Sequence, residues 1–212
     1  MYVDFDKQFI FLHNPRTGGT SLLRVLEKFT SVVLQTGEHE TLNDTHEVML
    51  RKSKIWDDYF KFSIVRNPWD RLYSAFKYLQ AGGSNFTDTR VGNIFVQPYA
   101  GDFNAFVENY DCWYKRPCHF IQYKHGMSPH LLPQSEFLTL DNSLAVDIVC
   151  RFENYEQEVT ELLHNLGINI DALPKLNSSD PVEDYRLAFT DKSMAIVSEL
   201  YADDIELFGY TF

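Results

Sequence analysis

The chain has 212 residues, of which 44% are hydrophobic, and this size and composition predict one domain spanning residues 1–212. Its formal net charge of −11 argues against broad binding to nucleic acid or to an anionic membrane surface, because both are themselves negatively charged. Any anionic ligand must therefore be held by local positive charge, which makes the positions of individual arginines informative.

Apolar runs alternate with helical patterns along the sequence. In chain order the predicted elements are a strand at 8–13, a helix at 20–29, a strand at 31–34, a weak helix at 41–52, a strand at 61–65, a helix at 67–80, a short helix at 103–109, a strand at 146–152 and helices at 153–166 and 191–208. This alternation predicts an α/β fold, with a parallel β-sheet flanked by helices on both faces. Since such sheets bind ligands outside the carboxyl ends of their strands, the loops after the first three strands should open on one edge.

The first motif joins the first predicted strand to a helix through the segment 13–21, which contains a glycine pair. Glycines let backbone N–H groups approach an anion, and the helix N-terminus adds partial positive charge. Thr17, Thr20 and Ser21 add hydroxyl donors, and Arg16 adds a full charge, so the segment predicts a site for a phosphate or sulfate oxyanion. It is not a Walker A loop, because no lysine follows the second glycine. A tight turn whose Ser and Thr residues only cap the helix is the alternative interpretation.

The second motif joins the third predicted strand to the helix that follows it. Arg66 stands at the carboxyl end of that strand, Asn67 suits the helix N-cap, and Pro68 suits the first helical position. Arg71 and Ser74 are three residues apart, so they share one face of the helix. An arginine at a strand end and a serine on the following helix can grip one phosphate from two sides. A helix cap accompanied by surface arginines is the alternative interpretation.

Taken together, the two motifs resemble the sulfotransferase superfamily, especially the branch that includes the heparan sulfate 2-O-sulfotransferases and small bacterial homologues. In that family a loop like the first motif binds the 5′-phosphosulfate of 3′-phosphoadenosine-5′-phosphosulfate (PAPS). A segment like the second binds the 3′-phosphate through its arginine and a serine eight residues later, the spacing of Arg66 and Ser74. The predicted nucleotide-binding residues are Arg16, Thr17, Gly18, Gly19, Thr20, Ser21, Arg66, Arg71 and Ser74.

The resemblance spans almost the whole chain and is weakest over residues 80–135. In the C-terminal half it is carried by the segments 151–154, 173–179 and 201–210. It implies a three-layer sandwich like that of P-loop NTPases and an enzyme that works without a metal. The sequence departs from the family at Arg16, where lysine is most common. We expect Arg16 still to hold the phosphosulfate, because arginine keeps the charge and can contact two oxygens.

Sulfuryl transfer needs in-line geometry, stabilisation of charge on the leaving oxygen, and a base for the incoming hydroxyl. Arg16 is the predicted stabiliser of the leaving group. The predicted base is His39, in the loop after the second strand, because imidazole titrates near neutrality and carboxylates flank it. Glu38, Glu40 and His46 are further candidates for this role. A solvent-exposed His39 with no role is the alternative interpretation.

The sequence says less about the acceptor. A small-molecule or carbohydrate acceptor is implied by the resemblance alone. The aromatic stretch 95–123 suits stacking on sugar rings, but such residues equally form a core. Lys115, Arg116 and Lys124 suit an anionic acceptor, and solvated surface charge explains them equally well.

The chain contains three cysteines, an odd number without CxxC spacing, which favours a reduced, cytoplasmic protein. No signal peptide and no run of about 18 apolar residues are visible, so no membrane span is predicted. The histidines are scattered and form no HExxH motif, so no metal site is predicted.

Two competing functions remain at the level of sequence. An ATP-dependent small-molecule kinase on a related phosphate-loop fold would need a Walker lysine, which the first motif lacks, and a carboxylate for magnesium. A non-catalytic module that binds a nucleotide or a glycan would keep the fold without the chemistry. The presence of Arg16, Thr20, Ser21, Arg66 and Ser74 together argues against such a module.

Overall fold

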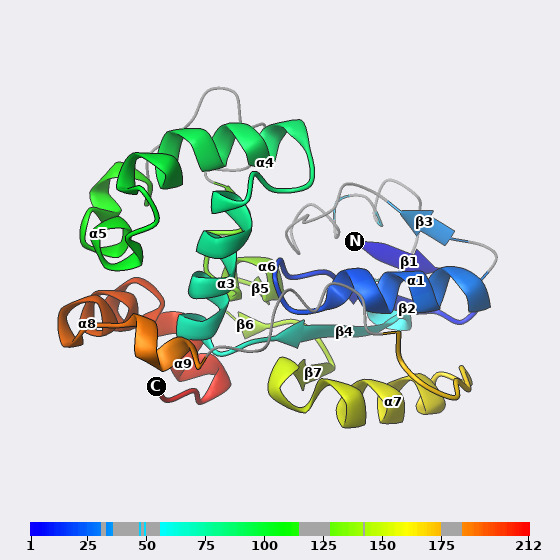
Figure 1. The fold of residues 1–212 in the computed structure, drawn as a ribbon. Coiled ribbons are helices and arrows are strands. Elements are labelled where there is room, and N and C mark those ends of the chain that lie inside the picture. The colour runs from blue at the N-terminus through cyan, green and yellow to red at the C-terminus, as the bar shows by residue number, and fades with distance from the viewer. Residues whose placement is uncertain are drawn as a thin grey trace. The chain divides into compact units, whose positions relative to one another are not determined.

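Figure 1 shows the fold in a computed structural model. The structure describes residues 1–30, 33–35, 47, 49, 56–114, 128–141, 143–174 and 184–212. They belong to two compact units, each assembled from two stretches of chain. The sheet unit comprises Met1–Arg66 and Gln134–Ser179, and the helical unit comprises Asn67–Pro133 and Asp180–Phe212. The single domain predicted over residues 1–212 stays a prediction.

The sheet unit is built on a five-stranded sheet with the strand order β3-β1-β2-β4-β7. The strands are β1 (Tyr2–Asp4), β2 (Phe9–Leu12), β3 (Val33–Gln35), β4 (Phe60–Val65) and β7 (Ile148–Arg151). β2, β4 and β7 pair in parallel, whereas β1 lies antiparallel between β2 and β3. The predicted α/β class is confirmed. β1 was not predicted from the sequence, because three residues are too few to show a period.

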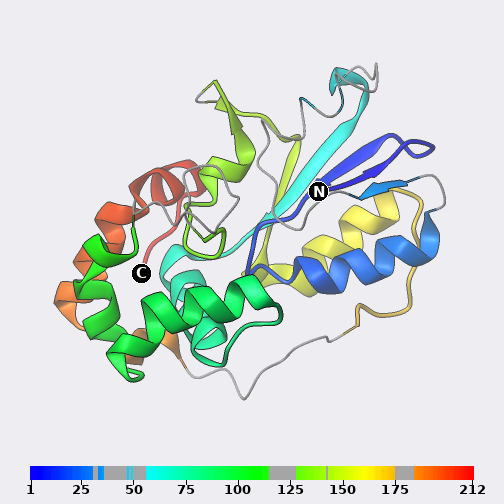
Figure 2. The same cartoon turned by 90° about the horizontal axis from the view of Figure 1, so that it is seen from above.

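The helices α1 (Gly19–Phe29) and α7 (Tyr155–Asn165) cover one face of this sheet, and Figures 1 and 2 show both on the same side. Side chains alternate along a strand, so every second strand residue points to this face. The core that results contains Phe9, Phe11, Phe62, Ile64 and Cys150 from the strands, and Leu22, Leu26, Val159 and Leu163 from the helices. The intervening residues Ile10, Leu12 and Val65 are buried as well. Burial of both faces explains why these strands read as continuous apolar runs.

Short elements complete the sheet unit. They are η1 (Trp56–Asp58), α6 (Ser135–Leu138), the antiparallel pair β5 (Thr139–Leu140) and β6 (Ser143–Leu144), and the 3-10 turn η6 (Phe152–Asn154). The turn η6 occupies the first residues of the helix predicted at 153–166, so α7 begins two residues later. Of the weak helix predicted at 41–52, only residues 47 and 49 are described, and both are helical.

The helical unit contains no strand among its described residues. Its elements are α3 (Pro68–Gln80), α4 (Phe86–Val91), the π-helical turn η2 (Gly92–Val96), η3 (Gln97–Tyr99), α5 (Phe103–Glu108), η4 (Tyr110–Cys112), η7 (Tyr185–Ala188), α8 (Asp191–Leu200) and α9 (Ala202–Phe208). The predicted helix at 191–208 is divided at Tyr201, whose φ of −117° and ψ of 29° depart from helical values. The N-cap of α8 is Thr190.

Aromatic rings fill the core of the helical unit. Phe106 and Trp113 stack with ring centroids 4.6 Å apart, and the Trp113 indole donates to the carbonyl of Phe106 at 2.9 Å. Phe76 packs against Phe106 at 5.2 Å. Trp113 is only 1% exposed, so this residue of the aromatic stretch belongs to the core and does not present a ring to a sugar. Residues 115–127 lie outside the described residues, and they include the end of that stretch, Cys118 and the three cationic residues named above.

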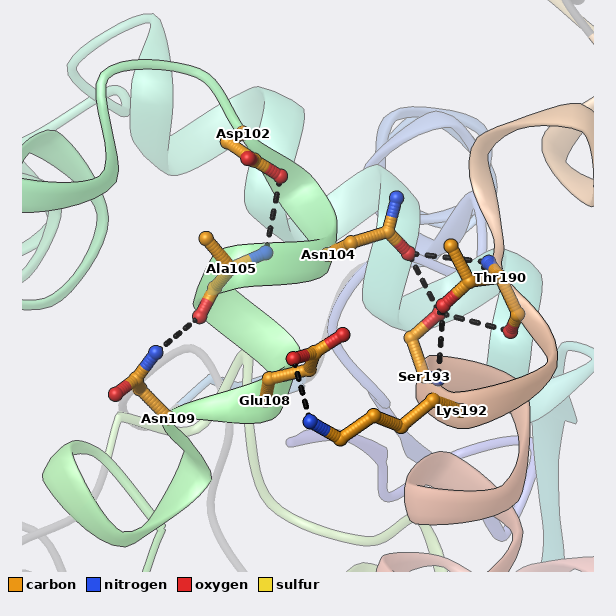
Figure 3. A network of polar contacts seen from close by, with 8 residues as sticks. All are labelled: Asp102, Asn104, Ala105, Glu108, Asn109, Thr190, Lys192 and Ser193. Carbon is orange, nitrogen blue, oxygen red and sulfur yellow. Dashed lines mark hydrogen bonds and ion pairs between the residues drawn. The ribbon is translucent and has the colours of Figure 1, made fainter.

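A polar network docks α5 against the start of α8 (Figure 3). The Asn104 Oδ1 atom accepts hydrogen bonds from the Thr190 backbone N–H at 3.1 Å and from the Ser193 hydroxyl at 2.6 Å. Thr190 and Ser193 also form a capping box for α8. Lys192 adds an ion pair with Glu108 at 2.7 Å. One asparagine therefore joins the cap of α8 to α5.

Candidate functional site

Four strands of the sheet unit end at the same edge. β2, β4 and β7 are parallel, and β3 runs in the same direction as β2 because both are antiparallel to β1. Tyr2 of β1 lies in register with Phe11 on one side and Gln35 on the other, so β2 and β3 end at the same level. The prediction of one shared edge is confirmed for the ends of these strands and for the loops after β2 and β4. His39, Glu38, Glu40 and His46 lie outside the described residues, but the strand that leads to them ends here.

The loop after β2 has an unusual backbone. Arg16 has a φ of 67° and Gly18 a φ of 80°, so two left-handed residues flank Thr17. A non-glycine residue in this region is uncommon, and such conformations concentrate at functional sites. The Thr17 hydroxyl is buried and donates to the carbonyl of Asn14 at 2.9 Å, so it is used within the loop. The Thr17 side chain therefore holds the turn together.

Close packing requires both glycines of this loop. A Cβ at Gly18 would lie 2.9 Å from Cε2 of Tyr155, and a Cβ at Gly19 would lie 2.1 Å from Cδ2 of His13. Gly18 is also the N-cap of α1, and its carbonyl accepts the backbone N–H of Ser21 at 3.0 Å. The glycine pair thus allows the tight turn and leaves no side chain over the backbone at the start of α1.

The loop is anchored to the neighbouring strand by buried polar groups. Asn14 is fully buried, and its Nδ2 donates to the carbonyl of Ile64 at 3.1 Å. The Ser63 hydroxyl donates to the carbonyl of Leu12 at 2.6 Å. Because the partners come from β2 and β4, the base of the loop is fixed to two strands.

The start of α1 suits an anion. Its first turn contains no acidic residue, and the N-terminus of an 11-residue helix carries unsatisfied N–H groups and partial positive charge. Thr20 is exposed there, whereas Ser21 is 6% exposed. Arg16 is partly exposed in the loop that precedes them. The predicted oxyanion donors are therefore gathered at one helix end.

Arg66 follows β4 and reaches this loop. Its Nη1 donates to the carbonyl oxygen of Arg16 at 3.2 Å, and its guanidinium carbon lies 4.3 Å from the centroid of the Phe152 ring. Its main chain is held by the buried side chain of Gln134, which accepts from the Arg66 N–H at 2.8 Å and donates to the Arg66 carbonyl at 2.9 Å. Both the backbone and the side chain of Arg66 are thus fixed.

Tyr155, at the start of α7, completes the surroundings of the loop. Its hydroxyl donates to the carbonyl of Gly18 at 3.2 Å. Burial raises the pKa of Tyr155 well above its ordinary value, and the nearby Cys150 acts in the same direction. Tyr155 therefore stays a neutral donor over the whole physiological pH range.

The second motif has mixed outcomes in the helical unit. The predicted cap is confirmed: the Asn67 side chain accepts from the N–H of Trp69 at 3.1 Å, and Pro68 opens α3. Arg71 is 1% exposed and donates to the carbonyl of Leu132. The alternative interpretation as a surface arginine is therefore wrong for Arg71. Ser74 lies partly exposed on the same helix. Nucleotide binding by Arg71 and Ser74 stays a prediction.

Three residues of this site were not named from the sequence. Phe152 lies within the segment 151–154 that carries part of the family resemblance, so a signal existed there. Tyr155 follows one residue after that segment. Gln134 left no signal, because its role depends on a contact with a main chain 68 residues away.

Within the described ranges, no group of three or more His, Cys, Asp or Glu residues could hold a metal ion. No helix in this part of the chain is long and apolar enough to cross a membrane. Two cysteines are described as free thiols, exposed Cys112 and buried Cys150. Burial raises the pKa of Cys150 to about 12, with Glu158 and Glu161 adding to the effect, so this thiol stays protonated.

Comparison with known proteins agrees with the two motifs. No curated protein sequence is significantly similar to the chain. A family model described as the sulfotransferase family matches residues 1–211, and this range contains both motifs and the segment 151–155. The match confirms the resemblance and covers nearly the entire sequence. The chain therefore belongs to the sulfotransferase family and is a transferase of sulfuryl groups.

Proposed function

We propose that the protein transfers the sulfuryl group of PAPS to a hydroxyl group of a carbohydrate and releases adenosine 3′,5′-bisphosphate. The observation that supports this most directly is the contact between Arg66 and the loop after β2, at 3.2 Å. PAPS carries anionic groups on both sides of its ribose, so its site needs two neighbouring sets of donors. The described edge of the sheet supplies both sets in a protein whose net charge is −11.

The loop after β2 is the proposed site of the 5′-phosphosulfate. Main-chain N–H groups at the start of α1, together with Thr20 and Ser21, face the charge that develops on the leaving phosphate oxygens. Arg16 adds a full positive charge to the same oxygens. These donors are fixed before the ligand arrives, because the loop is bonded to β4 through Asn14. Fixed donors stabilise the transition state without reorganising during transfer.

Arg66 is the proposed ligand of the 3′-phosphate. A guanidinium has five N–H donors, and the contact with Arg16 uses the Nη1 end of the group. Stacking on Phe152 uses the face of the guanidinium plane, whereas hydrogen bonds form along its edges. A guanidinium matches two oxygens of one phosphate, which makes Arg66 the proposed ligand. Ser74, eight residues later, is the second proposed ligand.

The in-line attack needs a base on the acceptor side, and His39 is the proposed base. β3 ends at the same edge as β2, so Gln35, the last described residue before His39, lies at the edge where the first motif begins. The protein's own side chains then deprotonate the acceptor hydroxyl and stabilise the negative charge on the leaving oxygens. The proposed reaction uses no metal ion. A carbohydrate acceptor follows from the family resemblance.

The decisive experiment is transfer of labelled sulfate from PAPS across a panel of sugars, lipids and phenols, with and without a chelator. We expect a labelled sugar product in both conditions. Labelled phenols or lipids without labelled sugars would contradict the carbohydrate acceptor, and loss of transfer with chelator would contradict metal independence. Binding of PAPS without transfer to any acceptor would favour a non-catalytic module, and magnesium-dependent turnover of ATP would favour a kinase.

A further inference from the structure

A third segment, remote in sequence from both motifs, touches each of them. It comprises residues 152–155, directly after β7. The Phe152 ring stacks against the guanidinium of Arg66 at 4.3 Å, and the Tyr155 hydroxyl donates to the carbonyl of Gly18 at 3.2 Å. The rings of Phe152 and Tyr155 also contact one another, with centroids 6.2 Å apart. One short segment therefore reaches both halves of the proposed donor site.

We propose that Phe152 and Tyr155 are positioning residues for the donor nucleotide. Phe152 fixes the orientation of Arg66 toward the 3′-phosphate, and Tyr155 fixes the peptide after Gly18 toward the 5′-phosphosulfate. This inference rests on the proposed function, because it concerns how the same nucleotide is held.

The case for Phe152 comes from the freedom of an arginine side chain. A long side chain that is ordered only when its ligand binds loses rotamer entropy at that moment and lowers the affinity. The Arg66 main chain is already fixed by Gln134 through two hydrogen bonds. The ring of Phe152 and the carbonyl of Arg16 fix the other end of the side chain. Arg66 is thus ordered before the nucleotide arrives.

The case for Tyr155 comes from the geometry of the peptide bond. A trans peptide is planar, so its C=O and N–H point in opposite directions. The Gly18 carbonyl points toward Tyr155 and toward the Ser21 N–H, which donates to it at 3.0 Å. The N–H of Gly19 therefore points away from both, at the N-terminus of α1. Fixing the carbonyl of Gly18 fixes the direction of a main-chain donor to the anion.

The two roles predict different ligand profiles, which calorimetry can separate with two probes. Adenosine 3′,5′-bisphosphate carries both phosphates, and adenosine 5′-monophosphate lacks the 3′-phosphate. Phe152→Leu should weaken binding of the bisphosphate about threefold to thirtyfold and leave the monophosphate unchanged, as expected for a lost contact between a cation and a ring. Tyr155→Phe should weaken both probes about twofold to tenfold, as expected for one lost hydrogen bond.

Three further variants test whether the effect runs through Arg66. Phe152→Tyr keeps the ring and should restore wild-type affinity. In the background of Arg66→Ala, Phe152→Leu should cause no additional loss. Phe60→Leu removes another partly buried ring of the same unit, away from the loop, and should bind both probes as the wild type does. If Phe152→Leu does not fold, Phe152→Met removes the ring with an unbranched side chain that adapts to irregular space.

The role of Phe152 would be overturned if Phe152→Leu lost the same affinity for both probes. It would also be overturned if Phe152→Leu weakened binding as much in the Arg66→Ala background as in the wild type. Unchanged affinity of Tyr155→Phe for the monophosphate would overturn the role of Tyr155. If the wild type binds the bisphosphate and these patterns fail, only the positioning roles are wrong. If the wild type binds neither probe, the positioning roles fall together with the proposed donor.

Discussion

The guanidinium of Arg66 donates from Nη1 to the carbonyl oxygen of Arg16 at 3.2 Å. The two residues are 50 positions apart, and each follows a strand of one parallel pair, β2 and β4. Parallel strands end at the same edge, so this topology brings the two motifs together. A structure with Arg66 and the glycine turn on different faces would have contradicted a shared nucleotide, and the observed hydrogen bond excludes that arrangement.

Replacement of Arg66 tests the proposed 3′-phosphate site. Arg66→Ala should weaken the binding of adenosine 3′,5′-bisphosphate by about 1.5–3 kcal/mol, because it removes a charge-assisted contact to the phosphate. Isothermal titration calorimetry measures the difference directly. Arg24 offers a matched control, since it is an exposed arginine on α1 of the same unit. Arg24→Ala should bind normally, and normal binding by Arg66→Ala would refute the assignment.

Replacement of His39 tests the proposed base. His39→Ala should lower the transfer rate by about a hundredfold or more, the usual contribution of general base catalysis, while the affinity for adenosine 3′,5′-bisphosphate is unchanged. Single-turnover transfer and calorimetry separate the two effects. Turnover within a few-fold of the wild type would show that the base is another residue. Glu38→Gln, Glu40→Gln and His46→Ala would then identify it.

The sequence was informative where local chemistry decides the structure. The glycine pair, Asn67 and Pro68 each impose a local geometry, and the structure has the turn, the cap and the helix start at these residues. The apolar run before the first motif predicted a buried strand, and all four residues of β2 are indeed buried. The fold class and the shared edge of the two motifs followed from these local signals.

The remainder depends on contacts that no local pattern contains. The Gln134 side chain hydrogen-bonds the main chain of Arg66. The Tyr155 hydroxyl donates to the carbonyl of Gly18, 137 residues away. Arg71 shares a helix face with Ser74, and the sequence did not show that the structure buries this arginine against Leu132. Helical spacing identifies which residues share a face, but the neighbours of that face are set by tertiary packing.

The network of Figure 3 predicts a stability effect that is separate from nucleotide binding. Asn104→Ala removes the acceptor of the Ser193 hydroxyl, which is fully buried, and of the Thr190 N–H. Its free energy of unfolding should fall by roughly 1–3 kcal/mol, because the bond of Asn104 to the Ala188 carbonyl is lost as well, while Thr190 and Ser193 keep the bonds between them. Urea denaturation followed by tryptophan fluorescence measures the change.

Asn109 is the matched control for Asn104. Its Nδ2 donates to the carbonyl of Ala105 at an exposed position just after α5. Asn109→Ala should therefore change the free energy of unfolding by no more than about 0.5 kcal/mol. Equal effects of the two variants would contradict a special role of the network. The affinity for adenosine 3′,5′-bisphosphate should be the same in both variants.

Gly18 carries two separate constraints that paired variants can distinguish. Its φ is 80°, and a Cβ would lie 2.9 Å from the Tyr155 ring. Gly167 has a similar φ of 70°, but a Cβ there would meet nothing closer than an Lys7 side-chain atom at 3.9 Å. Both alanine variants should lose about 1–2 kcal/mol of unfolding free energy from the left-handed conformation alone. Gly18→Ala should lose more, because Tyr155 must also move.

The same pair of variants separates stability from ligand binding. Displacement of Tyr155 and of the Gly18 peptide redirects a main-chain donor at the start of α1, so Gly18→Ala should bind adenosine 3′,5′-bisphosphate at least tenfold more weakly, which corresponds to about 1.4 kcal/mol. Gly167→Ala should bind it normally, because Gly167 lies beyond the C-terminus of α7, at the opposite end of that helix from Tyr155. Calorimetry at a temperature where both variants are folded measures the two affinities. Equal affinities would show that the glycine turn serves the fold alone and that the anion is held elsewhere.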